Sequence, residues 1–310
     1  MWIYLAAAGI GLLLGSRSPA AAGAAETMIW PVLGVLLYVT FLQVPLTSLR
    51  NAAGDRRFLA AVLVGNFLLV PLLVWALTGV AGLPPAVTLG ILLVLLVPCT
   101  DWYLSFTHLV RGDTAAAVAV TPLNLLLQLL LLPVYLWLFL GGEFGDLIVT
   151  GTVATAAAIL IGLPLLAALG TEQVATRRPA VSAWQRRSGV LVVPLVAVVV
   201  LLVATSQVGE VTGALHLLPS LAAVFGVFLA LAVATGWLLA RGLRLPARTA
   251  RAAVLSLGTR NSFVVLPLAL ALPPEWRTAA VVIVYQSLIE LLGLVLLVWL
   301  VPRMVPDPAA

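Results

Sequence analysis

The chain of 310 residues is poor in charge: only 9% of its residues are Asp, Glu, Lys or Arg, and none of them is lysine. Soluble domains contain about 25% charged residues, so this composition excludes a soluble globular protein. The mean hydropathy of +1.19 instead indicates an integral membrane protein embedded in a lipid bilayer.

Cysteine and histidine are scarce as well. Cys99 is the single cysteine, which excludes an internal disulfide or a site built from several thiolates of one chain. Both histidines, His108 and His216, fall near the ends of apolar runs. An intramembrane hydrolase needs a nucleophile with a base in reach, paired aspartates or a zinc-type cluster, and the sequence offers none of these patterns. We therefore predict no enzyme, no metal site and no cofactor.

Ten apolar runs are candidate membrane spans, because a bilayer core of about 30 Å needs about 20 apolar residues. The runs cover residues 2–14, 28–48, 58–80, 86–110, 114–140, 147–169, 188–206, 216–240, 251–272 and 278–301. The first run is short enough to be a signal-peptide core, but no basic flank precedes it, and we count it as a span.

The arginines divide unequally between the two sides of such a bundle. Threading ten spans places thirteen arginines on one side and only Arg17 and Arg277 on the other, with Arg260 inside a span. Basic loops stay in the cytoplasm, so both termini are predicted to be cytoplasmic and the protein to lie in the cytoplasmic membrane. The formal charge of +5 then reflects topology and implies no nucleic-acid partner.

Polar residues recur in both halves at nearly matching positions. The fourth run contains VPCTDWYLSF (97–106), and the ninth contains SLGTRNSFVVLP (256–267). The next run of each half has a polar pair on one helix face: Asn124 with Gln128, and Gln286 with Glu290. This pattern predicts an all-α fold of two inverted five-helix repeats, residues 1–141 and 146–303. In such transporters the substrate binds near the midplane, where broken helices meet, so the fourth and ninth spans should be broken and cross.

Three ionisable residues lie deep in apolar runs: Asp101, Arg260 and Glu290. Each costs at least about 2.5–3.5 kcal/mol at the bilayer centre, which favours a transport site over a receptor or scaffold. A structural polar lock between helices is the alternative. We predict that Asp101 and Arg260 pair where the broken helices cross. Glu290 is then predicted to bind and release a coupling proton.

Several neighbouring residues admit two interpretations. Cys99 follows Pro98, which loosens the helix, so its thiol either meets a thiophilic solute or packs as a small apolar side chain. The amides of Asn66, Asn124, Gln128 and Gln286 either contact the solute or join helices by hydrogen bonds. We include all of them in the predicted substrate and ion site.

Four segments resemble arsenical-resistance permeases, the arsenite efflux transporters of the bile acid:sodium symporter superfamily. They are PCTDWYLSFTHLVRGD (98–113), TPLNLLLQLLLLPVYLWL (121–138), GTRNSFVVLPLALAL (258–272) and VVIVYQSLIELLGLVLLVWLVP (281–302). The resemblance implies a core domain (about 57–141 and 216–303) and a panel domain (about 1–50 and 146–206). Four residues match positions of the arsenite permease site: Cys99, Thr100, Asn261 and Glu290.

The same resemblance bears on the coupling ion. The sodium-coupled branch of the superfamily carries Ser-Asn where this chain has Tyr103 and Leu104, a glutamate in place of Ser256 and a glutamine in place of Arg260. The sodium ligands are thus largely replaced, and Arg260 is interpreted as an internal substitute for a bound cation. Asp101 departs from the arsenite permease pattern, which has a small or apolar residue there.

The predicted function is therefore secondary transport by alternating access, with export of arsenite or a related metalloid coupled to protons rather than sodium. The alternative is an organic-anion transporter in which Arg260 meets a carboxylate or sulfonate, assisted by half-helix amino ends. Neither alternative specifies an oligomeric state.

Overall fold

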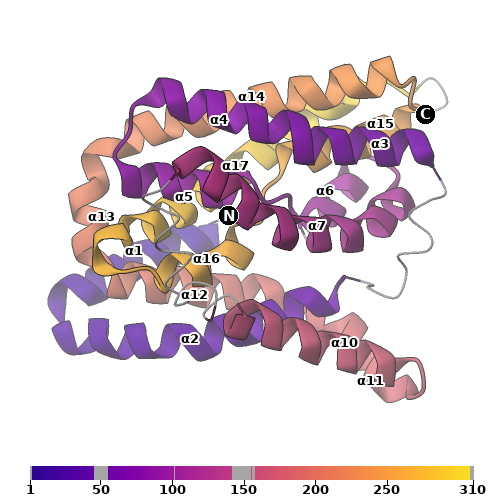
Figure 1. Ribbon diagram of the computed structural model, residues 1–310. Coiled ribbons are helices and arrows are strands. Elements are labelled where there is room, and N and C mark those ends of the chain that lie inside the picture. The colour runs from indigo at the N-terminus through magenta and orange to yellow at the C-terminus, as the bar shows by residue number, and fades with distance from the viewer. Residues whose placement is uncertain (1, 45–54, 101, 142–154, 156–157, 308–310) are drawn as a thin grey trace.

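The computed structural model describes residues 2–44, 55–100, 102–141, 155 and 158–307, and these residues form helices joined by short turns (Figure 1). Six helical segments are long and apolar enough to cross a membrane: Pro19–Leu42, Arg56–Ala81, Thr114–Leu140, Pro179–Ser206, Val208–Gly242 and Pro274–Met304. Three shorter apolar helices are Trp2–Arg17, Pro85–Leu95 and Ile159–Ala175. A multi-pass, all-helical membrane protein is thereby confirmed among the described residues.

Among the described residues the number of long spans is smaller than the ten predicted, and the reason differs from span to span. The predicted fourth and ninth spans each consist of two short helices separated by extended backbone. The predicted sixth span, 147–169, lies partly outside the described residues. The first helix has only 16 residues.

A first helix group packs along one side of the molecule (Figure 1). It consists of α1 (Trp2–Arg17), α2 (Pro19–Leu42), α10 (Leu163–Ala175), α11 (Pro179–Ser188) and α12 (Val192–Ser206). Helices α1 and α12 approach closely because α1 presents glycine to its partner. A Cβ added at Gly11 would lie 2.5 Å from the Leu201 carbonyl oxygen, so only glycine permits this contact.

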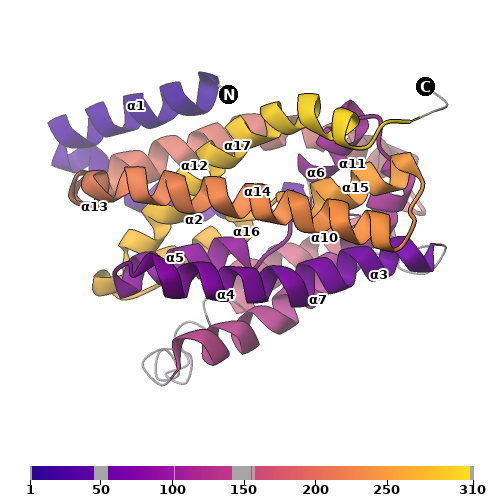
Figure 2. The ribbon, with the colours of Figure 1, turned by 90° about the horizontal axis from the view of Figure 1, so that it is seen from above.

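A second helix group forms the rest of the molecule. It consists of α3 (Arg56–Val64), α4 (Val70–Ala81), α5 (Pro85–Leu95), α6 (Trp102–Leu109), α7 (Thr114–Leu140), α14 (Leu218–Gly242), α15 (Ala247–Gly258), α16 (Ser262–Leu270) and α17 (Thr278–Met304). Helix α13 (Val208–Ala214) leads from α12 into α14. Figure 2 shows that most helices of both groups run roughly along one common direction.

Two helices of the second group are interrupted in mid-molecule. Helix α5 ends at Leu95, three residues before Pro98, whose ring lacks the N–H needed to continue the helix. Helix α15 ends at Gly258, and Thr259 is extended with φ −117° and ψ 140°. Helix α16 restarts at once because the Asn261 side chain accepts a hydrogen bond from Val264 N–H as its N-cap. In Figure 1, α5 and α16 lie in one half of the bundle and α6 and α15 in the other.

A π-helical turn, Gly65–Leu69, separates α3 from α4. Pro71 follows it and cannot donate to the carbonyl one turn earlier, at Phe67. The Tyr135 hydroxyl donates to this Phe67 oxygen instead, at 2.6 Å. The wider turn brings Asn66, which is fully buried, toward the interrupted helices.

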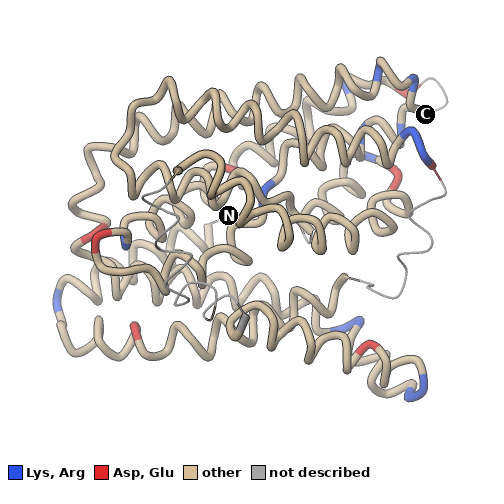
Figure 3. Tube along the Cα trace, viewed as in Figure 1, with Lys and Arg blue, Asp and Glu red and all other residues tan. Residues whose placement is uncertain are grey.

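Charged residues gather at the two ends of the helices and leave most of the middle uncharged (Figure 3). At one end Arg251 is buried and donates to the carbonyl oxygens of Val110 and Val305 at 3.1 and 3.0 Å, which ties the α6–α7 turn to the end of α17. At the other end Arg277 pairs with Glu26. Apart from the buried Arg260 and Glu290, the middle of the described chain has the composition expected of a segment surrounded by lipid.

Candidate functional site

The two breaks are joined by backbone hydrogen bonds. Cys99 N–H donates to the Thr259 oxygen at 3.2 Å, and Asn261 N–H donates to the Val97 oxygen at 2.8 Å. Pro98 and Arg260 face one another in the resulting antiparallel bridge. An unpaired backbone group costs several kcal/mol inside a membrane. The two backbone hydrogen bonds between the breaks satisfy groups that would otherwise be unpaired, and they therefore allow two helices to be interrupted at the same depth.

The Arg260 guanidinium lies in a cluster of neutral oxygens. The side chain is only 2% exposed. Nη2 donates to Asn66 Oδ1 at 2.8 Å and to the oxygens of Ser256 at 3.0 Å and Leu257 at 2.6 Å. Nη1 donates to the Leu95 oxygen at 3.3 Å. The carbonyl ends of α5 and α15 carry partial negative charge, so one cation neutralises both helix ends.

Asn66 and Ser256 complete this oxygen cluster. Asn66 Nδ2 donates to Ser256 Oγ at 3.0 Å, which orients the amide oxygen toward Arg260. The Phe228 ring covers the guanidinium, with its centroid 5.6 Å from Cζ. The arrangement resembles a cation site in which the protein supplies both the oxygen ligands and the cation.

Glu290 lies on the other side of the crossing, where its carboxylate contacts the Arg260 backbone. Its two carboxylate oxygens accept from Arg260 N–H at 3.1 and 3.0 Å. Gln286 Nε2 donates to Glu290 Oε2 at 2.7 Å, and Ser262 Oγ donates to Gln286 Oε1 at 2.7 Å. The Glu290 carboxylate is thus held in place by one peptide N–H and one side-chain amide.

Cys99 and Glu290 share one small cavity. Asn261 and Ser287 line the same space, which has a volume of about 10 Å³, roughly that of a single water molecule by this measure. Thr100 lies beside it, where its Oγ1 accepts from Asn261 Nδ2 at 2.9 Å. Any solute larger than water can enter only when the surrounding helices move.

Asn124 and Gln128 differ from the other predicted amides. Both are buried on α7, and in the described part of the chain neither amide nitrogen nor amide oxygen finds a hydrogen-bond partner. Each such buried group costs about 1–3 kcal/mol. Four unsatisfied atoms on one helix face are the strongest sign of a place for water or solute beside α7.

One predicted site residue, Asp101, lies outside the described residues, and with it the predicted pairing with Arg260. Sequence reasoning placed neither Ser256 nor Ser262 in the site, although their hydroxyls bond Asn66 and Gln286. Their positions flanking the GTRN break were the available signal, because small polar residues next to a break can satisfy freed groups.

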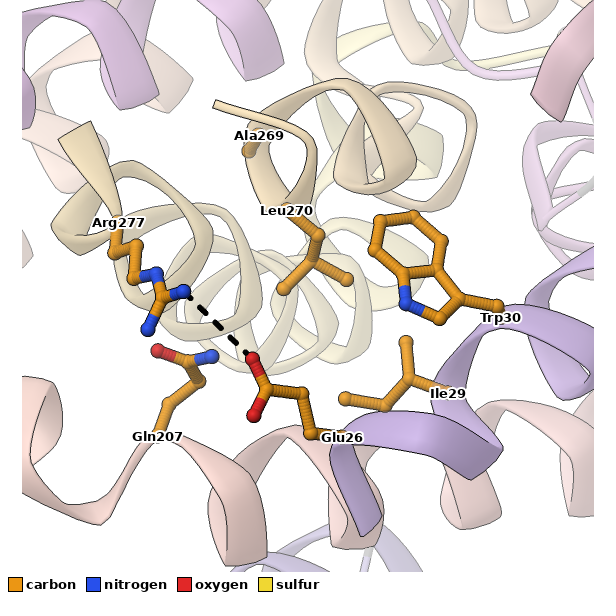
Figure 4. A pocket seen from close by; sticks show the side chains of 7 residues that line it. All are labelled: Glu26, Ile29, Trp30, Gln207, Ala269, Leu270 and Arg277. Atoms are coloured by element: carbon orange, nitrogen blue, oxygen red, sulfur yellow. Dashed lines mark ion pairs between the residues drawn. The ribbon is translucent and has the colours of Figure 1, made fainter. Parts of the chain in front are cut away.

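A second pocket lies where the two helix groups meet, at the end of the molecule opposite to Arg251. Figure 4 shows Glu26 of α2 and Arg277, just before α17, facing each other across it, with Gln207 beside them. Arg277 Nη2 lies 3.7 Å from Glu26 Oε1, and both side chains are half-exposed. Glu210 also accepts from the Thr278 hydroxyl at 2.7 Å. These contacts hold α2 and α13 against the start of α17.

Together these features define a multi-pass helical membrane protein with a buried polar centre at two interrupted helices. Residues 30–214 match the model of the sodium bile acid symporter family, and because the match covers more than half of the chain, the protein belongs to that family. Members of this family are membrane transporters of solutes rather than enzymes. Comparison with curated proteins gives no match.

Proposed function

We propose that the protein is a secondary active transporter of the cytoplasmic membrane that exports arsenite, or a related metalloid species, in exchange for protons. The observation that carries this proposal is that Cys99 and Glu290 line the same cavity. A thiophilic solute and a proton would then bind within one site, and alternating occupancy would couple their movements.

The transport cycle follows from two bodies that move against each other. In this proposal the ten spans form two inverted five-helix repeats with both termini in the cytoplasm. The first helix group corresponds to the panel (about 1–50 and 146–206), and the second to the core (about 57–141 and 216–303). The small cavity at the crossing supports this cycle, because Trp102, which lines it, stacks on Tyr4 of α1 with 5.9 Å between ring centroids, so that movement of the first group changes access to the cavity.

Proton coupling is favoured over sodium coupling by the surroundings of Arg260. The guanidinium already neutralises the carbonyl ends of α5 and α15, where a bound cation would otherwise act. Two sodium ligands of the sodium-coupled branch, a glutamate and a glutamine, are replaced in this chain by Ser256 and Arg260. Among the described residues, Glu290 is the carboxylate that lines the cavity at the crossing.

Arsenite chemistry suits a lone thiol. Trihydroxy arsenite exchanges one hydroxyl for a thiol: an As–S bond forms, an As–O bond breaks, and the thiol proton leaves with the hydroxyl as water. A single thiol forms one such As–S bond, and one bond is easier to reverse than the several bonds that a group of thiols would form. Cys99 can thus hold the solute during a conformational change and release it afterwards.

Cys99→Ala is expected to abolish arsenite tolerance in an arsenite-sensitive cell that expresses the transporter. Cys99 N–H, not its side chain, makes the bond to Thr259, so the substitution leaves the crossing backbone intact. Growth against arsenite concentration measures the effect, with membrane abundance determined in parallel. Tolerance equal to that of the wild type would exclude the thiol contact.

Glu26→Gln is expected to let the two helix groups separate more often at the pocket shown in Figure 4. Half-exposed ion pairs contribute about 0–1 kcal/mol, so the open population should rise by up to about fivefold. The rate at which an impermeant maleimide labels Cys99 from the outer side reports this population, because no other cysteine exists.

The reciprocal exchange provides the control for this experiment. Glu26→Arg combined with Arg277→Glu should restore the wild-type labelling rate, and a Cys99→Ser protein should not be labelled. Equal labelling rates in the wild type and in Glu26→Gln would show that the ion pair does not hold the two groups together.

An organic-anion transporter is the second candidate, and two observations favour it. An apolar groove of about 190 Å³ lies between α1, α12, α14 and α17, with Tyr285 on its wall. The buried Arg260 Nε has no hydrogen-bond partner among the described residues. An amphipathic anion would fit a groove of this kind. Uptake of such an anion in the absence of arsenite would support this candidate.

A further inference from the structure

A separate cavity of about 200 Å³ lies at the end of the molecule that contains Arg251, between the end of α14 and the end of α17. Its walls include Trp237 and Arg241 of α14, Arg244 in the turn that follows, and Met304 of α17. This cavity is remote from the crossing of the interrupted helices and plays no part in the proposed transport cycle.

The chemistry of the walls suits an anion. Two arginines line the cavity, and within the described part of the chain no acidic residue is among its lining side chains. The Arg241 guanidinium lies 4.7 Å from the centroid of the Trp237 ring, and Trp237 Nε1 in turn donates to the Met304 oxygen at 3.3 Å. This contact fixes one guanidinium in place, which lowers the entropy lost when an anion binds.

The backbone beside the cavity closes the end of α14 through a left-handed residue. Arg244 has φ 53°, a left-handed conformation that non-glycine residues rarely adopt. That turn lets Arg244 N–H donate to the Arg241 oxygen at 3.1 Å, and Leu245 N–H to the Ala240 oxygen at 2.9 Å. The α14 carbonyls that would repel an anion are thereby occupied.

The adjoining surface of α14 identifies where the anion comes from. Val227, Leu231 and Leu238 are 47%, 45% and 60% exposed, and their spacing places them on the helix face that ends at Arg241. An exposed apolar stripe leading to a pair of arginines matches a phospholipid, whose chains lie along the stripe while the phosphate meets the arginines. Tryptophan beside such a site is typical of the membrane interface.

We infer that this cavity, the α14 end site, binds the phosphate of an anionic phospholipid headgroup between Arg241 and Arg244. Juxtamembrane arginines attract anionic lipids by about 1 kcal/mol each. The apolar stripe adds the contribution of the acyl chain, which a free phosphate ion lacks.

The test is thermal unfolding of the full-length protein in detergent with added lipid. Phosphatidylglycerol should raise the unfolding temperature by roughly 5 °C relative to phosphatidylcholine with the same acyl chains. Arg241→Gln and Arg244→Gln should each remove at least about half of this shift. Arg241→Lys combined with Arg244→Lys should retain it, since both charges remain.

The control is Arg186→Gln, which removes one charge from α11, where Arg186 bonds Ser182 and does not line the cavity. This variant should keep the full shift. An equal shift in the wild type and in both glutamine variants would overturn the proposal. A shift reproduced by inorganic phosphate alone would overturn the assignment to a lipid. If a glutamine variant does not fold, loss of the shift in the lysine pair would equally contradict the site.

Discussion

Arg260→Ala is expected to eliminate solute flux and to lower the unfolding temperature by at least about 6 °C. The substitution strands the acceptors at Asn66, Ser256 and Leu257, each at a cost of about 1–3 kcal/mol. It also leaves the carbonyl ends of α5 and α15 without a neutralising charge. Flux in proteoliposomes and thermal unfolding in detergent measure the two effects separately.

Arg303→Ala is the matched control, because Arg303 is exposed and its guanidinium stacks on the Trp299 ring at 3.9 Å. Surface substitutions change stability by about 0.5 kcal/mol, so its unfolding temperature should fall by no more than about 2 °C. Full flux in Arg260→Ala would contradict a role for the guanidinium in the site.

A double substitution separates the cation role of Arg260 from a merely structural one. Ser256→Glu with Arg260→Gln introduces the two residues that the resemblance assigns to sodium-coupled relatives. We expect its flux to rise with sodium, while wild-type flux does not. A wild-type protein already stimulated by sodium would show that Arg260 does not replace a bound cation.

Glu290→Gln should abolish accumulation driven by a proton gradient while leaving exchange of labelled for unlabelled solute measurable. The glutamine oxygen can still accept from Arg260 N–H, so the crossing keeps its shape, but the side chain no longer carries a proton. Accumulation and exchange are measured in the same proteoliposomes.

Glu275→Gln is the control for this prediction, since Glu275 is an exposed carboxylate in the short turn before α17. It should accumulate solute as the wild type does. Undiminished proton-driven accumulation by Glu290→Gln would rule out Glu290 as the coupling group. Loss of exchange as well would indicate a role in solute binding instead.

Local chemistry made the helix breaks predictable. Pro98 removes a helical donor, and the GTRNS segment (258–262) combines glycine with an N-capping asparagine, so both interruptions have a signal in the residues themselves. The π-helical turn at Gly65–Leu69 was not predicted, because it depends on Tyr135 satisfying the Phe67 carbonyl from a distant helix.

The contacts within the site were less accessible to sequence reasoning. Burial of Arg260 and Glu290 follows from their apolar surroundings, but their partners come from folding in three dimensions. Arg260 turns back onto its own helix end and onto Asn66, while Glu290 accepts from a peptide N–H. Sequence spacing paired the amides of the two halves, yet Gln286 is hydrogen-bonded, whereas Asn124 has no hydrogen-bond partner among the described residues.

The most direct test of the proposed function is flux into proteoliposomes under separate proton and sodium gradients, with arsenite and organic anions offered in turn. We predict arsenite flux that follows the proton gradient, ignores sodium and disappears in Cys99→Ala. Uptake of an organic anion driven by sodium, with no arsenite flux under either gradient, would contradict the proposed substrate and the proposed coupling ion together.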